Sequence, residues 1–223
     1  MYKVNTYYYG NTESDNILIQ MVDDHDMAVI EKEIEYIREL SLSDDFCLVA
    51  IKVDNWNDDL SPWKAPAVFG KDDFGGNADV TLSKVLEYIN TEVFAGKNQA
   101  DINLYIGGYS LAGLFALWAA YQTDVFKGVA AASPSVWFPG IEEYISQNDI
   151  KSSAVYLSLG DKESKTKNKT MAQVGDNIQR IYKILDTKVD ANLEWNEGNH
   201  FKGPDLRTAK AFAWVLTRDI QLC

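Results

Sequence analysis

A chain of 223 residues, 46% hydrophobic and 24% charged, is long enough to bury a sizeable core, and a single domain over residues 1–223 is expected. Its net charge of −12 argues against nucleic acid or an anionic membrane as a partner, because both would be repelled. Two cysteines, Cys47 and Cys223, form no disulfide framework and no metal-ligand spacing. With no signal peptide and no apolar run near the roughly 20 residues of a spanning helix, the sequence predicts a cytoplasmic protein that needs neither metal nor cofactor.

The first half of the chain predicts alternating strands and helices, judged from runs of β-prone residues and from apolar residues at helical spacing. The first two strands are separated by a turn-rich spacer, which allows a hairpin. Residues 54–76 form a long, irregular segment with several aromatic rings. The predicted elements are strands 3–9, 17–22 and 46–53 and helices 26–40 and 77–94.

The second half continues the alternation, and its elements are strands 102–106, 128–133, 154–160 and 191–195 with helices from 111, over 141–147, 171–187 and 204–218. Strands that alternate with helices imply a mostly parallel sheet with helices on both faces, an α/β fold. In such sheets the functional residues lie on loops at the carboxyl ends of the strands. Three of these loops carry polar residues of interest.

The stretch 102–120 predicts a strand, a sharp turn with Ser110 at its apex, and an apolar helix. This is the context of a nucleophile elbow, in which a serine hydroxyl is exposed at the sheet edge. Gly108 lies two residues before the serine, while Ala112 stands where the usual pattern has glycine, and Gly113 follows. The alternative is an ordinary strand-to-helix turn in which Ser110 caps the helix.

A serine nucleophile needs a base, and the chain has two histidines, His25 and His200. The usual order along the chain is serine, acid, histidine, which only His200 satisfies. His25 is predicted to interact with the acidic residues beside it. The acid is expected after strand 154–160, where both Asp161 and Glu163 are candidates to orient the imidazole.

An oxyanion needs two N–H donors. One is expected from Leu111, the residue after the serine, and the other from Asn55 or Trp56, which follow the strand 46–53. The aromatic segment that begins at Trp56 either completes the core or forms a pocket wall. The predicted pocket residues are Tyr109, Trp63 and Trp137.

With these motifs, Gly-Gly-Tyr-Ser-Leu-Ala-Gly at 107–113, Leu-Ser-Leu-Gly-Asp-Lys-Glu at 157–163 and Gly-Asn-His-Phe at 198–201, the chain resembles the esterase branch of the α/β-hydrolases. That branch includes siderophore esterases, feruloyl esterases and S-formylglutathione hydrolases. The resemblance in element order covers nearly the whole chain and implies an α/β-hydrolase fold without a separate cap domain. In that branch the acid is commonly the third residue after a strand-end glycine, which favours Glu163 over Asp161.

The leading hypothesis is therefore a serine hydrolase that cleaves carboxylic esters of small molecules through an acyl-enzyme, with Ser110, His200 and Glu163 as its triad. A thioesterase or an acyltransferase with the same triad is an alternative. A non-catalytic binding protein with the hydrolase fold is another. The sequence leaves the oligomeric state open.

Overall fold

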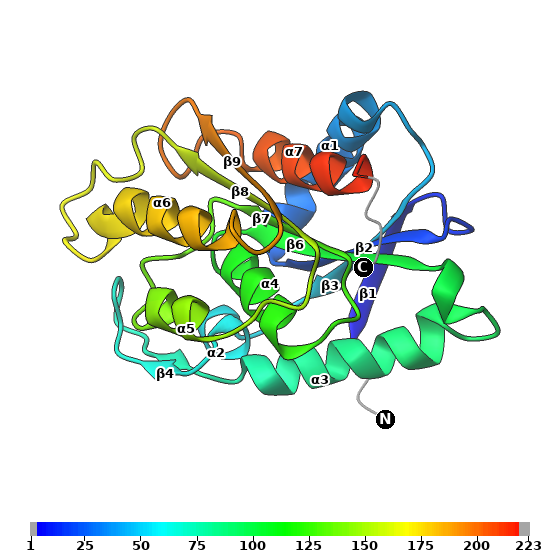
Figure 1. Cartoon of the computed structure of the whole chain (residues 1–223), viewed down its shortest axis with the longest axis horizontal. Coiled ribbons are helices and arrows are strands. Elements are labelled where there is room, and N and C mark those ends of the chain that lie inside the picture. Colours follow the sequence, from blue (N-terminus) through cyan, green and yellow to red (C-terminus); the bar gives the residue numbers. More distant parts are fainter. Residues whose placement is uncertain (1–3, 219–223) are drawn as a thin grey trace.

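The structure is a computed structural model that describes residues 4–218 (Figure 1). Within them, one seven-stranded sheet has the order β1-β3-β2-β6-β7-β8-β9. Strand β1 pairs antiparallel with β3, and every other neighbouring pair in this sheet is parallel. The strands are β1 (Asn5–Gly10), β2 (Asn16–Val22), β3 (Cys47–Lys52), β6 (Asn103–Tyr109), β7 (Gly128–Ala132), β8 (Ala154–Gly160) and β9 (Asp190–Asn196).

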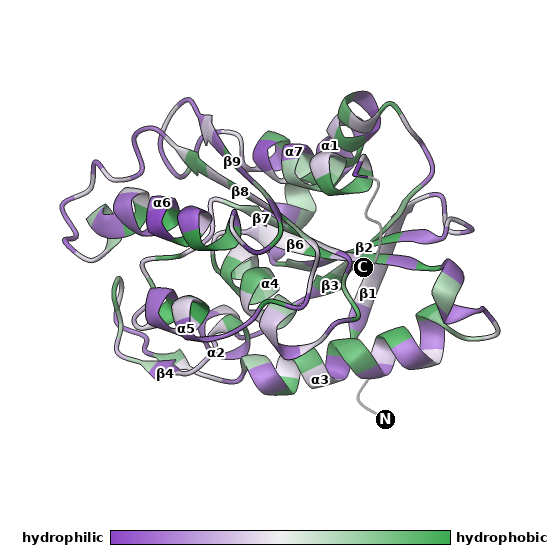
Figure 2. Cartoon of the chain, viewed as in Figure 1, coloured by the Kyte–Doolittle hydropathy of each residue, from purple (hydrophilic) through white to green (hydrophobic). Residues whose placement is uncertain are grey.

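Helices cover both faces of this sheet, as the sequence predicts (Figure 1). Helices α1 and α7 lie side by side on one face, and α2 to α6 lie on the other. In Figure 2 the central strands and α4 are largely hydrophobic, while the helices at the surface alternate in colour, as amphipathic helices do. The helices are α1 (Asp24–Ser41), α2 (Trp56–Leu60), α3 (Ala78–Tyr88), α4 (Leu111–Gln122), α5 (Ile141–Gln147), α6 (Val174–Leu185) and α7 (Pro204–Leu216).

The suggested hairpin of the first two strands is wrong. Strand β1 pairs with β3, and β2 lies between β3 and β6. The reason is burial: β2 is buried from Ile17 to Val22, so its backbone needs a partner on each side, whereas β1 is half exposed and suits an edge. Lys3 and Cys223 lie outside the described residues.

The segment 54–76 is more regular than predicted. It contains the short helix α2 and a two-stranded sheet of β4 (Lys64–Ala65) and β5 (Phe74–Gly75). Leu60 at the end of α2 is fully buried in the core. Elements of two to five residues are too short to show a hydrophobic period, so the sequence gives no signal for them.

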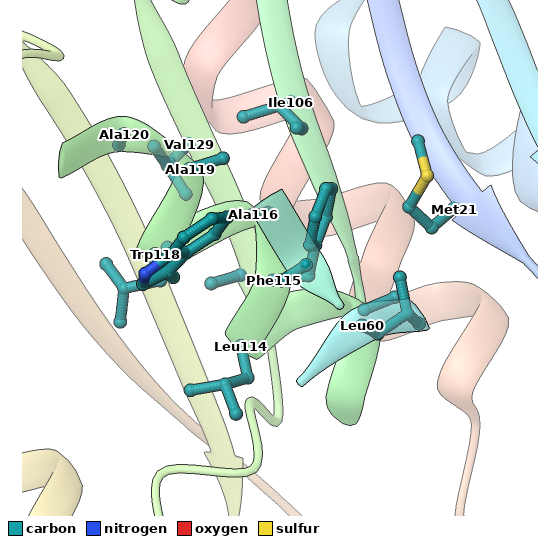
Figure 3. Packing of buried hydrophobic residues seen from close by; sticks show 14 of the residues in the cluster. Met21, Leu60, Ile106, Leu114, Phe115, Ala116, Trp118, Ala119, Ala120 and Val129 are labelled. Carbon is teal, nitrogen blue, oxygen red and sulfur yellow. The ribbon is translucent and has the colours of Figure 1, made fainter. Parts of the chain in front are cut away.

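Helix α4 is the packed centre of the larger core (Figure 3). It is buried without interruption from Leu111 to Tyr121, as expected of a helix that is apolar on all sides. Figure 3 shows Phe115 and its neighbours among Ile106, Val129, Leu60 and Met21, which come from three strands and α2. Ser110, which precedes this helix, is therefore held by rigid elements on both sides. No helix within residues 4–218 combines the length and the apolar character that crossing a membrane requires.

Candidate active site

Ser110 occupies a strained turn between β6 and α4. Its backbone has φ 56° and ψ −117°, a conformation that a residue with a side chain rarely adopts. Three backbone hydrogen bonds hold it there. The Ser110 N–H donates to Ala132 O at 3.1 Å, and Ser110 O accepts from the N–H groups of Leu114 at 3.1 Å and Ser135 at 3.0 Å. Strain of this kind persists where surrounding structure enforces it, and it is concentrated at functional sites.

Small residues allow the strand and the helix to cross so closely. A Cβ built on Gly108 would lie 2.7 Å from the Cβ of Ala112, and one on Gly113 would lie 2.9 Å from Gly108 O. Neither contact is sterically tolerable. Ala112 therefore fits, in place of the usual glycine, because Gly108 leaves room for its methyl group.

Ser110, His200 and Glu163 form a continuous chain of hydrogen bonds across three loops. The Oγ of Ser110 lies 3.0 Å from His200 Nε2, and His200 Nδ1 lies 2.7 Å from Glu163 Oε2. Glu163 is in the turn after β8, and His200 follows β9, so all three side chains meet at the carboxyl edge of the sheet. Because an ionised carboxylate can only accept a hydrogen bond, His200 Nδ1 carries the hydrogen and donates it to Glu163, which leaves Nε2 to accept the hydroxyl hydrogen of Ser110.

The other two candidates lie elsewhere. The Oδ1 of Asp161 accepts a hydrogen bond from Gly198 N–H at 2.7 Å, so this carboxylate joins the acid loop to the histidine loop. His25 is at the start of α1, with its side chain 96% exposed and beside Asp23. Neither Asp161 nor His25 takes part in the hydrogen-bond chain from Ser110.

Arg207 of α7 is the residue that sequence reasoning missed. Its side chain is only 2% exposed, and Nη1 donates to Glu163 Oε1 at 2.8 Å and to the hydroxyl oxygens of Ser133 and Tyr109 at 3.1 Å. Its Nη2 donates to the carbonyls of Glu197 and Asn199. The sequence does indicate that Arg207 is buried. It lies one and two helical turns before Ala211 and Val215, and therefore on the same inward face of α7.

The surroundings of Glu163 keep it ionised. Burial raises its pKa, but hydrogen bonds and charge from His200, the Gly160 N–H and the Ser133 hydroxyl outweigh this, and the net pKa lies below the ordinary value. Burial is also the main reason that the pKa of Tyr109 is raised to about 12, so the phenol stays protonated. Its Oη–H donates to His200 O at 2.6 Å and so fixes the histidine loop.

The predicted oxyanion donors lie at the starts of two helices. Leu111 and Trp56 are the first residues of α4 and α2, so their N–H groups have no acceptor within the helix. The Asn55 N–H, in contrast, donates to Asp59 Oδ2 at 3.3 Å. Helix α2 packs against α4. A further hydroxyl, that of Ser135, lies 3.3 Å from Ser110 Oγ.

A cavity of about 470 Å³ opens beside His200 and Glu163. Trp137 lines it. Trp63 does not: its Nε1 donates to Pro139 O at 2.9 Å, and its ring packs on Phe138 and Tyr144. Tyr109 is buried and also lies outside the lining of this cavity. The lining residues are Ser133, Pro134, Trp137, Lys162, Glu163, Lys165, Thr166, Lys167, Met171, Val174, Asn199, His200 and Phe201.

Metal-binding side chains are not clustered in the part of the chain that the structure describes. Residues 4–218 hold no group of three or more His, Cys, Asp or Glu side chains placed to bind a metal ion. Glu163 and His200 are the acid and imidazole of the site, and both are already engaged with each other.

Comparison of the sequence with models of protein families finds no match, and comparison with curated proteins finds none either. Solved structures do match. An IroE-like serine hydrolase from Shewanella oneidensis is 15% identical, with 95% of this chain and 75% of that chain covered and a TM-score of 0.73.

Two further structures match over most of both chains. The siderophore hydrolase EstA from Aspergillus nidulans is 16% identical, with coverage of 95% and 93% and a TM-score of 0.65. The esterase Pf2001 from Pyrococcus furiosus is 11% identical, with coverage of 96% and 86% and a TM-score of 0.62. Together with the parallel sheet and the turn at Ser110, these similarities show that the chain has the α/β-hydrolase fold of these hydrolases and esterases.

Proposed function

We propose that the protein is a serine hydrolase that cleaves carboxylic esters through an acyl-enzyme. The observation that carries this proposal is the unbroken path from Ser110 Oγ to His200 Nε2, at 3.0 Å, and from His200 Nδ1 to Glu163 Oε2, at 2.7 Å. Both distances are those of a hydrogen bond, so a proton can leave the serine as it attacks. Structural similarity to hydrolases and esterases supports the proposal at the level of fold.

In this mechanism Ser110 Oγ attacks the ester carbonyl while His200 Nε2 takes the hydroxyl proton. The resulting oxyanion accepts hydrogen bonds from the N–H of Leu111 and of Trp56. His200 then gives the proton to the departing alkoxide, and the C–O bond to the alcohol breaks. Water attacks the acyl-serine with His200 again as the base, which releases the carboxylic acid and restores Ser110. Glu163 remains ionised and stabilises the imidazolium throughout.

A panel of aryl esters with graded acyl chains tests this function. Replacement of Ser110 by alanine is expected to lower turnover by roughly 10³-fold or more without affecting the melting temperature. His200→Ala is expected to act similarly, while His25→Ala serves as the matched histidine control and keeps wild-type turnover. Turnover that survives in Ser110→Ala would exclude the proposed nucleophile. Thioesters in the same panel separate ester from thioester hydrolysis.

A further inference from the structure

A lysine-rich loop borders the proposed catalytic centre of an otherwise acidic protein. The segment 162–169, Lys-Glu-Ser-Lys-Thr-Lys-Asn-Lys, has four lysines in a chain with a net charge of −12. Three of them, Lys162, Lys165 and Lys167, line the cavity beside His200. We refer to these three residues as the cavity lysines.

The cavity lysines form no close ion pair with an acid among residues 4–218. None of the ion pairs in this part of the chain involves them, whereas the nearby Lys202 is paired with Glu197 at 3.0 Å. The one acid of the segment, Glu163, is turned inward to His200 and Arg207. The charge of Lys162 is partly opposed by Glu197, whose pKa it helps to lower, so the positive charge available to a ligand comes mainly from Lys165 and Lys167.

The loop that carries these lysines is anchored at both ends. The Lys162 N–H donates to Gly198 O at 3.0 Å, and the Lys165 N–H donates to Lys162 O at 3.0 Å. Farther along, Asn168 Nδ2 donates to Val68 O, 100 positions away in the sequence. An anchored loop holds the backbone from which the lysine side chains extend in place before a ligand binds, and this lowers the entropic cost of binding.

The rest of the cavity wall is largely apolar. It includes Trp137, Met171, Val174 and Phe201. The Phe201 side chain is unusual, since the residue is 87% exposed and its ring centroid is 5.6 Å from that of His200. An apolar wall with a few polar groups converging on it is typical of a small-molecule pocket.

We propose that the substrate is an ester that bears a second, anionic group such as a carboxylate on an apolar body. The cavity lysines bind the anion, and Phe201 and Trp137 contact the body. This inference rests on the proposed esterase function and narrows its substrate class. The net negative charge of the chain does not oppose it, because exposed charges are screened over about 8 Å at physiological ionic strength, while the lysines act within the cavity. Lysine suits this role as a point charge that accepts anions of varied geometry.

Two pairs of chromogenic or ultraviolet-detected esters test the proposal and locate the anion. In the first, 4-nitrophenyl hydrogen adipate carries the carboxylate on the acyl side, and its methyl ester is the neutral match. In the second, 4-acetoxybenzoate carries it on the alcohol side, and methyl 4-acetoxybenzoate is the match. The quantity measured is the ratio of kcat/KM for the anionic ester to that for its neutral match. Comparing this ratio between enzyme variants cancels the intrinsic reactivity of each ester.

The test variant is Lys165→Gln/Lys167→Gln, and the matched control is Lys71→Gln/Lys183→Gln, which removes the same charge from exposed lysines outside the cavity. In the test variant we expect the ratio for at least one pair to fall about 5- to 30-fold, through KM rather than kcat, since the anion lies away from the reacting bond. Added salt should also lower the ratio for the wild-type enzyme, because it screens the attraction between the lysines and the anion. The control is expected to keep the wild-type ratio within about twofold.

Unchanged ratios for both pairs in the test variant would overturn the proposal, even if the neutral esters are cleaved normally and the esterase function stands. An equal fall in the control variant would also overturn it, because the effect would then belong to net charge. If no ester in either pair is cleaved in a Ser110-dependent manner, the proposed function itself fails, and the substrate class fails with it.

Discussion

Two buried glutamates, one in the turn after β8 and one in α1, occupy opposite electrostatic environments. The Glu163 side chain is 4% exposed, and its carboxylate accepts hydrogen bonds from His200, Arg207, the Ser133 hydroxyl and the Gly160 N–H. Glu33, in α1, is 3% exposed and has one long contact, with Gln20 Nε2 at 3.5 Å. Its Oε1 has no hydrogen-bond partner among the described residues.

The protonation states differ accordingly. Burial raises the pKa of both carboxyls, but at Glu163 the hydrogen bonds prevail and the net pKa is lowered. At Glu33 the negative charge of Asp26 adds to burial, and the pKa is raised well above its ordinary value. Burial alone therefore does not mark a catalytic acid. The feature that points to a catalytic acid is a buried carboxylate that its hydrogen-bond partners keep ionised beside a histidine.

Removal of the Glu163 charge should have the largest effect on activity. Glu163→Gln keeps the shape but no longer stabilises the imidazolium or its tautomer, so we expect kcat to fall roughly 10²- to 10⁴-fold. Substrate binding should change much less. Asp161→Asn is the matched control in the same turn, and a loss of less than about tenfold is expected there. If Asp161→Asn were the crippling change, Asp161 would be the acid.

Arg207 is expected to act as a positioning residue for Glu163. Arg207→Met would leave the buried carboxylate without its cation, which raises the pKa of Glu163 and lowers turnover by roughly 10- to 10²-fold. The acid limb of the kcat/KM profile should then move to higher pH. A purely structural arginine would lower stability without moving that limb.

Because Arg207→Met removes one member of a buried pair, it should also lower the free energy of unfolding by about 3–5 kcal/mol. Arg207→Lys provides the second variant if this change prevents folding. It keeps the charge but not the five donors, so partial activity with the acid limb near its wild-type position is expected.

How much of this site can be read from the sequence depends on how local each signal is. The elbow and the order of Ser110, Glu163 and His200 can be predicted from the sequence, because each of these residues follows a strand that is recognisable as a run of β-prone residues. The geometry at Gly108 and Ala112 requires the crossing of strand and helix, which no residue pattern specifies. The choice between Asp161 and Glu163 depended on a resemblance, because both follow the same strand closely.

The hydrogen-bond network around the proposed triad depends on long-range contacts. Arg207 reaches Glu163 across 44 positions of sequence, and Ser133 reaches it across 30. The pairing of β1 with β3 is likewise a non-local event that a short turn-rich spacer does not reveal. Trp63 is predicted to line the pocket from its place in the aromatic segment, and in the structure its ring packs on Phe138 and Tyr144, outside the lining of the cavity beside His200.

Ser135 should have a smaller effect on catalysis. Its hydroxyl lies 3.3 Å from Ser110 Oγ, and because Ser110 donates to His200, Ser135 is the donor in this contact. Loss of one such neutral hydrogen bond is worth about 1 kcal/mol, so Ser135→Ala should lower kcat by less than about tenfold. Thermal unfolding of the variant serves as the control, and a loss above 10³-fold with normal folding would place Ser135 in the catalytic machinery.

Glu33→Gln should leave turnover unchanged and alter stability in a pH-dependent way. Folded Glu33 keeps a proton that the unfolded chain releases above its ordinary pKa of 4.5, so this group lowers stability as pH rises through that range. Glutamine does not titrate, and its amide donates to the unpartnered Gln20 Oε1. We expect the variant to gain roughly 1 kcal/mol at pH 8 and little at pH 4. A loss of stability at pH 8 would contradict a protonated Glu33.

The most direct test of the central claim is the site and rate of covalent labelling by a fluorophosphonate, followed by peptide mass spectrometry. The account predicts one adduct on Ser110 in the wild-type protein, slower labelling in Glu163→Gln, and none on the same timescale in His200→Ala. His25→Ala should label as the wild type does. Labelling at another residue, or undiminished labelling of Ser110 in His200→Ala, would contradict the assignment of Ser110 and His200 as nucleophile and base.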